Sequence, residues 1–204
     1  MSVLFCNNNS LSAITTKPSG LSGGTMNLIS TQTASSSATI SFTSGIDSTY
    51  DEYVFKFYDM HPATDAVKGK FNFSTDGTNF NVTKTTTGFY AGHTEADATG
   101  FGFDSALAQS TSDGFLSGGT VGNADDECLV GSFFLFAPSS TTYVKHFMAV
   151  TNISQDNDNS NNCYTAGYFN TTSDIDAMSF EPGRVTVSTV FQTGTIKMYG
   201  IKDS

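Results

Sequence analysis

The sequence predicts an all-β fold, an antiparallel β-sandwich with an extended N-terminal arm. The first reason is composition: only 14% of the 204 residues are charged, whereas there are 18 phenylalanines, 8 tyrosines and 19 glycines. Aromatic and β-branched residues suit pleated sheets, and glycine and asparagine suit tight turns. The second reason is periodicity, because no segment repeats apolar residues every 3.6 positions over three turns. Without helices for parallel crossovers, antiparallel pairing should dominate.

Two regions are expected, an arm at 1–48 and a β-sandwich domain at 49–204. The arm is rich in serine, threonine and glycine, and it contains two weak strands, at 26–30 and at 37–43. In the second of these, apolar and polar residues alternate, which is the pattern of a half-buried strand. Because apolar residues are sparse in the arm, we expect it to contribute less to the core than to contacts with neighbouring subunits.

The sandwich domain is anchored by its two most apolar segments. Tyr50–Met60 and Leu129–Phe136 carry large side chains on both faces, which indicates central strands. Phe71–Phe73 and Phe80–Val82 flank Asp76-Gly77, a dipeptide typical of β-hairpin turns. Further strands are predicted at 143–150, 163–169, 175–180, 185–191 and 195–201.

The stretch 88–123 lies between the predicted strands at 80–82 and 129–136. Its many glycines predict long loops. We expect its large apolar residues to enter the core; these are Phe101, Phe103 and Leu107.

The predicted central strand Leu129–Phe136 also indicates a subunit interface. Val130, Phe134 and Phe136 alternate with its core-facing residues, and a lone sandwich buries only the inner face of each sheet. These three side chains therefore need cover, either from 88–123 or from another subunit. Both alternatives stay open at this point, and we expect self-association.

Charge and cysteine content restrict the partners and the compartment. The net charge of −10 disfavours binding to nucleic acid and to anionic membranes. The cysteines, Cys6, Cys128 and Cys163, are odd in number and widely spaced, which favours three reduced, structural thiols and synthesis in a reducing cytosol. The N-terminus has no signal-peptide pattern, and no apolar run is long enough for a membrane helix.

No catalytic motif stands out, so we expect no enzymatic activity and no cofactor. The three histidines are scattered, and neither a hydrolase elbow nor a phosphate loop occurs. Calcium is the one candidate ligand, because Asp156, Asp158, Ser160 and Asn162 alternate as in a calcium loop. The sixth position, however, is asparagine instead of glycine, and the twelfth is glycine instead of glutamate. A solvated loop between strands is the competing interpretation.

Four segments resemble a group of small virion proteins of tailed bacteriophages, frequent in viruses of marine bacteria. They are YDEYVFKFYDMHPATD (50–65), PSSTTYVKH (138–146), GYFNTTSDIDAMSF (167–180) and GTIKMYGIK (194–202). The resemblance implies a structural protein of the phage particle with a jelly-roll-like sandwich. It carries strand and turn signatures and no functional residues. It also favours a homotrimer, because such proteins are commonly trimeric.

Two functions follow as expectations. The first is a capsid decoration, or cement, protein on the outer head surface, made in the bacterial cytoplasm and bound to itself and to virion proteins such as the major capsid protein. The alternative is a tail or fibre-tip module that binds host-surface glycans. Tyr90, Tyr164, Tyr168 and the loop 156–162 could then supply stacking rings and amides. A glycan-degrading enzyme is a third, weaker alternative.

Overall fold

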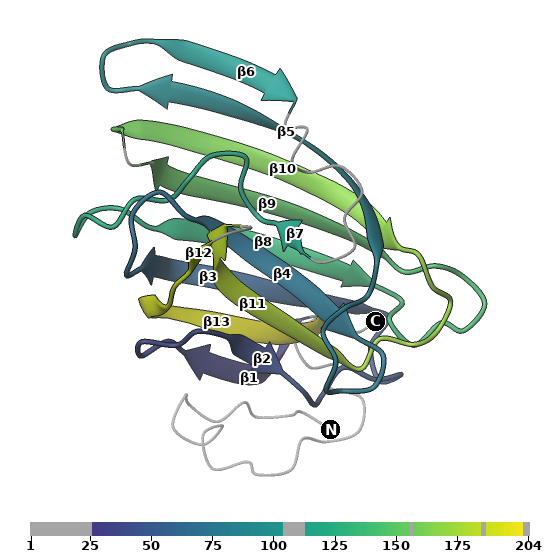
Figure 1. Ribbon diagram of the computed structural model, residues 1–204. Helices are drawn as coiled ribbons and strands as arrows, with labels where there is room; N and C mark the ends of the chain where they lie inside the picture. The colour runs from purple at the N-terminus through teal and green to yellow at the C-terminus, as the bar shows by residue number, and fades with distance from the viewer. Residues whose placement is uncertain (1–25, 104–112, 156, 185–186, 202–204) are drawn as a thin grey trace, which may run out of the picture.

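The computed structural model describes residues 26–103, 113–155, 157–184 and 187–201, which form two β-sheets packed face to face (Figure 1). Every strand pair is antiparallel, and the described residues contain no helix. The predicted all-β antiparallel sandwich is therefore confirmed.

The larger sheet has eight strands. In spatial order they are β1 (Met26–Thr33), β13 (Phe191–Ile201), β3 (Glu52–Pro62), β8 (Leu129–Phe136), β9 (His146–Gln155), β10 (Asn159–Phe169), β5 (Lys84–Thr94) and β6 (Thr99–Phe103). In Figure 1 the β5–β6 hairpin extends at the top, beyond the smaller sheet.

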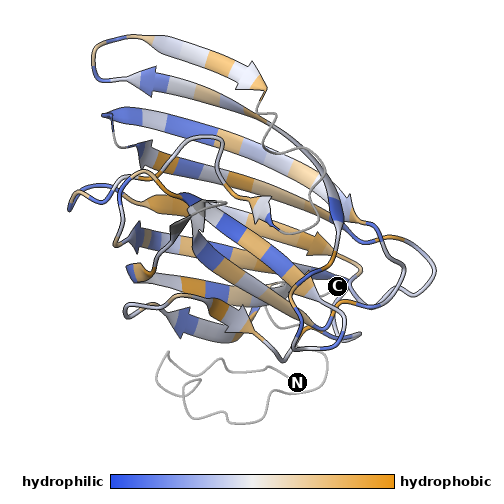
Figure 2. Ribbon diagram, in the orientation of Figure 1, coloured by the Kyte–Doolittle hydropathy of each residue, from blue (hydrophilic) through white to orange (hydrophobic). Residues whose placement is uncertain are grey.

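The smaller sheet covers the middle of the larger one (Figure 1). Its strands are β12 (Val187–Ser188), β11 (Ala177–Arg184), β4 (Lys68–Ser74) and β7 (Gly114–Phe115), and β2 (Ile40–Phe42) pairs with β11. Hydrophobic and hydrophilic residues alternate along many strands of both sheets (Figure 2), as expected where one face is buried.

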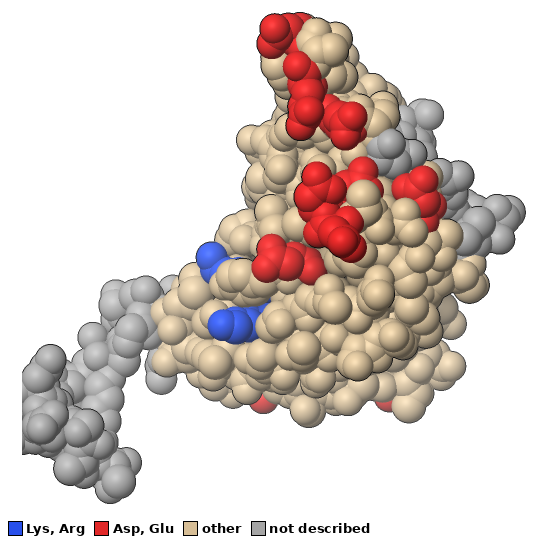
Figure 3. Space-filling model, turned by 90° about the vertical axis from the view of Figure 1, so that its left-hand side faces the viewer, with Lys and Arg blue, Asp and Glu red and all other residues tan. Residues whose placement is uncertain are grey.

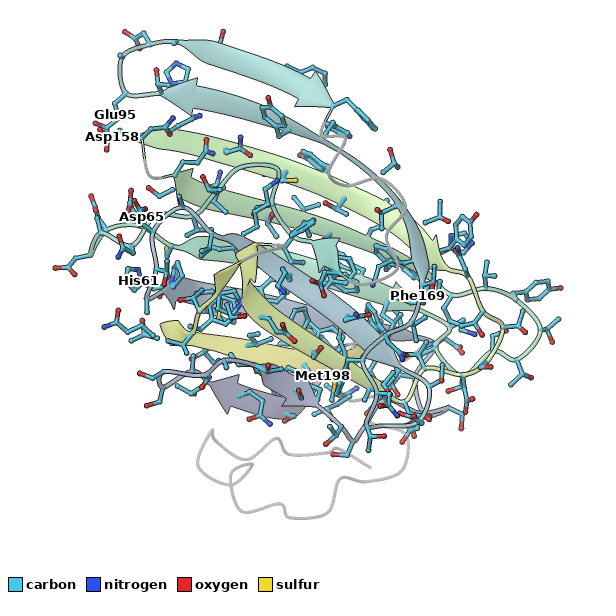
Figure 4. The ribbon with its side chains drawn as sticks, in the orientation of Figure 1. His61, Asp65, Glu95, Asp158, Phe169 and Met198 are labelled. Atoms are coloured by element: carbon cyan, nitrogen blue, oxygen red, sulfur yellow. The ribbon has the colours of Figure 1, made fainter. Side chains whose placement is uncertain are left out.

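Aromatic rings from both sheets form the core. Phe71 of the smaller sheet lies 5.0 Å from Phe133 of the larger one, and Phe73 lies 4.3 Å from Phe169, measured between ring centroids. Phe169 and Met198 point into the space between the sheets (Figure 4), and both are fully buried. Burying each such side chain contributes about 1.5–3 kcal/mol to stability.

Part of the predicted arm belongs to the sandwich. Residues 1–25 lie outside the described residues, but β1 pairs with β13 and β2 pairs with β11. Ile40 and Phe42 are buried, and the Phe42 ring packs edge-on against Phe55 at 5.2 Å. The two weak strands expected at 26–30 and 37–43 thus correspond to β1 and β2, and they extend the two sheets because a few well-placed apolar residues suffice to add strands to existing sheets.

The predicted hairpin around Asp76-Gly77 is wrong. A turn does form, with Gly77 at a φ of 74°, but β4 lies in the smaller sheet and the next strand, β5, lies in the larger one. The Asp76 carboxylate accepts hydrogen bonds from the backbone N–H of Asn79 (2.7 Å) and of Thr78 (2.9 Å), which lowers its pKa. After this turn the Val82 N–H donates to the Phe73 carbonyl oxygen at 3.3 Å, but no strand forms at 80–82 and the chain crosses to the larger sheet as β5.

In the described part of 88–123, strands take the place of the predicted loops at 88–94, 99–103 and 114–115, and 116–123 contain no named strand. Residues 88–103 form most of the β5–β6 hairpin, and β7 follows later. Phe101 is 76% exposed and Phe103 is 65% exposed, so the expectation that they enter the core is wrong, while Leu107 lies outside the described residues. The signal was present in the sequence, because phenylalanine and glycine alternate in 99–103 with the period of a strand.

Candidate functional site

The candidate site is the side of the larger sheet that faces away from the smaller one, called the outer face from here on. Directly opposed residues of an antiparallel pair project from the same face. One such row crosses five strands and consists of Val54, Phe134, Met148, Ala166 and Thr87. The chain neighbours of the first three belong to the core, so the row projects outward.

The outer face exposes many large apolar and aromatic side chains. They are Met26, Leu28, Tyr58, Phe89, Phe101, Phe103, Met148, Tyr164 and Tyr168. Soluble monomers rarely expose contiguous apolar patches of more than a few hundred Å². A surface of this kind is typical of a protein–protein contact.

The three residues predicted for a subunit interface also lie on the outer face. Val130, Phe134 and Phe136 are each half-buried, and all three come from β8. The β5–β6 hairpin does not fold over them. It continues the sheet through β10 and adds Phe101 and Phe103 to the same face. The β5–β6 hairpin, which contains most of the described part of 88–123, therefore does not cover Val130, Phe134 and Phe136.

A groove of about 340 Å³ interrupts the outer face. Ala166 leaves it open because its side chain is small, and Phe136, Met148 and Tyr168 line it together with His146 and three threonines of β5. Gly167 faces the interior of the sandwich, where an added side chain would come within 2.3 Å of the Thr85 carbonyl oxygen and 2.8 Å of the Phe147 ring, so glycine is required there. The groove has room for an aromatic side chain from a partner.

The exposed rings of the outer face are stacked against one another. Phe89 and Tyr164 are cross-strand neighbours with ring centroids 4.9 Å apart and planes 14° apart, and Phe101 follows at 5.7 Å from Phe89. Because 4.9 Å is about the spacing of adjacent strands, the normals of the stacked rings run along the sheet and the ring edges face solvent. Within this pair each ring covers one face of the other, so neither ring offers both faces to a sugar.

Charged groups are few on the outer face and dense at one end of the molecule. On the described strands β5, β6, β8, β9 and β10, no outward-facing residue is Asp, Glu, Lys or Arg. Acidic side chains gather instead at the end that lies on the left of Figure 1 (Figure 3). Asp65, Glu95 and Asp158 mark this end in Figure 4, beside His61.

The acidic end contains two shallow depressions, of about 310 Å³ and 440 Å³. Their carboxylates are those of Asp59, Glu95, Asp125, Asp126, Glu127 and Asp158. Among the residues that the structure describes, no group of three or more His, Cys, Asp or Glu side chains could hold a metal ion. The end gives the molecule a one-sided negative field.

Of the four residues considered for calcium, two lie on a strand. Asp156 lies outside the described residues, Asp158 occupies a turn at a φ of 56°, and Ser160 and Asn162 lie on β10. The Asn152 amide donates to Ser160 Oγ at 3.1 Å. Residues two apart on an extended strand are roughly 6.6 Å apart, so Ser160 and Asn162 do not converge as they would in a loop.

The residues considered for glycan binding are divided between the two faces of the sheet. Tyr164 and Tyr168 lie on the outer face, whereas Tyr90 lines a cleft of about 390 Å³ on the opposite face, with Asn159 and Asn161. Gln155 Oε1 accepts a hydrogen bond from Asn159 Nδ2 at 2.7 Å. Tyr90 therefore lies beside Asn159 and Asn161, two residues of the predicted loop, whereas Tyr164 and Tyr168 lie on the other face of the sheet.

The histidines and cysteines occupy unrelated positions. The Glu127 carbonyl oxygen lies 2.7 Å from His61 Nδ1, His93 Nε2 lies 3.9 Å from Asp97, and His146 lines the groove. Cys128 is half-buried and Cys163 is buried, and neither forms a disulfide. Cys6 lies outside the described residues.

No family model, curated protein or solved structure matches this chain. In the described residues, no helix is long and apolar enough to cross a membrane.

Proposed function

We propose that this chain is a structural protein of a bacteriophage virion, a decoration or cement protein of the outer head surface, and not an enzyme. The observation that carries the proposal is the outer face. From β8 to β6 this face is apolar and its outward residues include no Asp, Glu, Lys or Arg, which on a chain with a net charge of −10 is suited to burial against other proteins in a particle. Its partners are other copies of itself and virion proteins such as the major capsid protein.

The distribution of charge supports the same proposal. The acidic end leaves the outer face free for contact and keeps the assembled particle soluble. A negative protein is also better placed on the outside of a head than against the packaged genome, because phosphates repel carboxylates. The likeness to phage virion proteins described above points in the same direction.

Imaging of gold-labelled protein on the virions that carry it tests the location. Label over the head supports a decoration protein, and label at the tail supports the alternative function. Virions that carry no label, although the protein is made during infection, would contradict the proposal.

A binding assay tests the role of the outer face. Met148→Ser removes an exposed apolar side chain from its middle and should weaken attachment to particles that lack the protein. Asp125→Asn, at the acidic end, is the matched control and should attach normally. Equal attachment of both variants and the wild type would exclude the outer face from the contact.

The alternative, a tail module that binds host glycans, is favoured by one observation, the amide-lined cleft beside Tyr90. Asn161 is 2% exposed and its Oδ1 has no hydrogen-bond partner. Sugar hydroxyls are donors of the kind that such amides accept. A glycan array tests this function: binding that Asn161→Ala abolishes and Tyr164→Phe leaves intact would support the alternative, and binding to no glycan would remove it.

A further inference from the structure

We propose that two copies of this chain pair face to face through the outer faces of β8, β9, β10, β5 and β6. The Phe101 and Phe103 side chains of each copy occupy the groove of the other copy between Phe136, Met148 and Tyr168. This inference rests on the proposed function, because both take the outer face as a surface for contact with protein. It adds that a second copy of the chain occupies this surface.

The same face carries a projection and a matching depression. Phe101 and Phe103 are the most exposed phenylalanines of the described chain, at 76% and 65%. The groove holds about 340 Å³ and is lined mainly by apolar side chains. A phenylalanine side chain buries about 150–250 Å² when it enters such a site, which makes it a strong anchor.

Two-fold symmetry lets both insertions occur at once. In an isologous pair, residue i of one copy contacts residue j of the other, and j contacts i. In a face-to-face pair the two-fold axis lies in the plane between the two faces. If it passes midway between the projection and the groove, at right angles to the line that joins them, rotation about it places each projection over the partner's groove. The pairing closes with two copies, whereas the family resemblance favours three.

The area available is sufficient for a stable pair. The five paired strands, of 5–11 residues at about 3.3 Å per residue and about 4.8 Å apart, give a face of roughly 700 Å². A standard interface buries about 800 Å² on each partner. The five strands from β8 to β6 therefore supply an area close to that of a standard interface, without a contribution from β1, β13 or β3.

Electrostatics permit the contact despite the charge of the chain. Two chains at −10 repel each other at long range. The outward residues of β5, β6, β8, β9 and β10 include no Asp, Glu, Lys or Arg, so no like charges are brought together and no charged group is desolvated.

Sedimentation equilibrium of the full chain between 1 and 100 μM tests the pairing. We expect a mass of about 43 kDa, which is two chains of 21.7 kDa. The double variant Phe101→Ser/Phe103→Ser should dissociate at least tenfold more readily, and so should Ala166→Phe, which fills the groove from its own chain. Leu28→Ser, at the other end of the same face, is the matched control and should pair normally.

A cysteine pair provides a second measurement. In the variant Phe101→Cys/Ala166→Cys, oxidation should give a covalent dimer whose peptide map joins position 101 of one chain to position 166 of the other. Circular dichroism confirms that each variant is folded. A monomer at 100 μM, a trimer near 65 kDa, or a dimer unaffected by the phenylalanine and groove variants would each overturn the pairing. Location on the virion is measured separately, so a dimer absent from particles would contradict only the proposed function.

Discussion

Lys84 is a buried amine at the edge of the aromatic core. Its side chain is fully buried, and its Nζ donates hydrogen bonds to Asn72 Oδ1 at 3.0 Å and to the Val82 carbonyl at 3.2 Å. Nζ also lies 5.7 Å from the centre of the Phe71 ring. Burial disfavours the charged form and lowers the pKa of Lys84 from 10.5 to about 8, although the charge of Asp113 opposes the shift.

The lowered pKa predicts that stability rises with pH. Between about pH 8 and 10.5 the unfolded chain keeps the Lys84 proton and the folded chain releases it, so raising the pH favours the folded state. The full shift corresponds to about 3 kcal/mol. Lys84→Met removes the titration, so urea unfolding at pH 7.5 and pH 10, an interval that covers most of the shift, should show the wild type gaining about 2 kcal/mol relative to the variant.

The comparison with Lys84→Met cancels the other groups that titrate in this range. Burial raises the pKa of Cys128 and raises that of Tyr53 to about 12, and both are present in the two proteins. Lys84→Arg, which cannot deprotonate, is a second control and should also lack the gain. Parallel pH profiles for wild type and Lys84→Met would contradict the prediction.

The thiols are expected to stay reduced. Cys163 lies on the buried face of β10, and burial raises the pKa of Cys128, which lowers its thiolate fraction and its reactivity. Gels of the purified protein should therefore look alike with and without reductant. Disulfide-linked dimers of the wild type, or a Cys128–Cys163 bridge in a peptide map, would be the opposite result.

At the scale of the elements, β1 and β2 predict where the chain can be truncated. Deletion of residues 1–25 should leave a cooperatively folded protein that attaches poorly to particles, whereas deletion through 43 removes both strands together with Phe42 and should prevent folding. Phe42→Ala in the full chain should cost about 3–5 kcal/mol, because it leaves a cavity against Phe55 and Phe180. Thermal unfolding measures each effect. A folded protein that starts at 44 would place 26–43 outside the core.

Strands with strong local patterns were predictable and strand partners were not. Tyr50–Met60 and Leu129–Phe136 correspond closely to β3 and β8, because alternation of large side chains is visible within one segment. Phe80–Val82 fails as a strand because the direction of the chain after Asp76 depends on which sheet receives β5. The same limit applies to the candidate site. Val130, Phe134 and Phe136 could be grouped from the sequence because they alternate within one strand. Met148 and Phe89 lie on other strands, so only the register of the sheet shows that they share the same face.

The charge of the whole molecule predicts that it does not bind DNA. The net charge is −10, and the carboxylates gather at one end without a basic stripe in view (Figure 3). A mobility-shift assay at micromolar protein and physiological salt should show free DNA only. A retarded band that disappears at higher salt would reveal a basic surface that this charge distribution does not provide.

The sequence by itself determined the fold class, the acidic balance and the identity of the central strands, because composition and alternation are properties that each segment carries alone. Only the tertiary structure decided which side chains meet. Cys163 is opposite Tyr90 and Tyr164 is opposite Phe89, so the register of β10 on β5 sends the two tyrosines to opposite faces. Successive side chains of a strand alternate between faces, and one residue of register therefore decides whether a group joins the outer face or the interior.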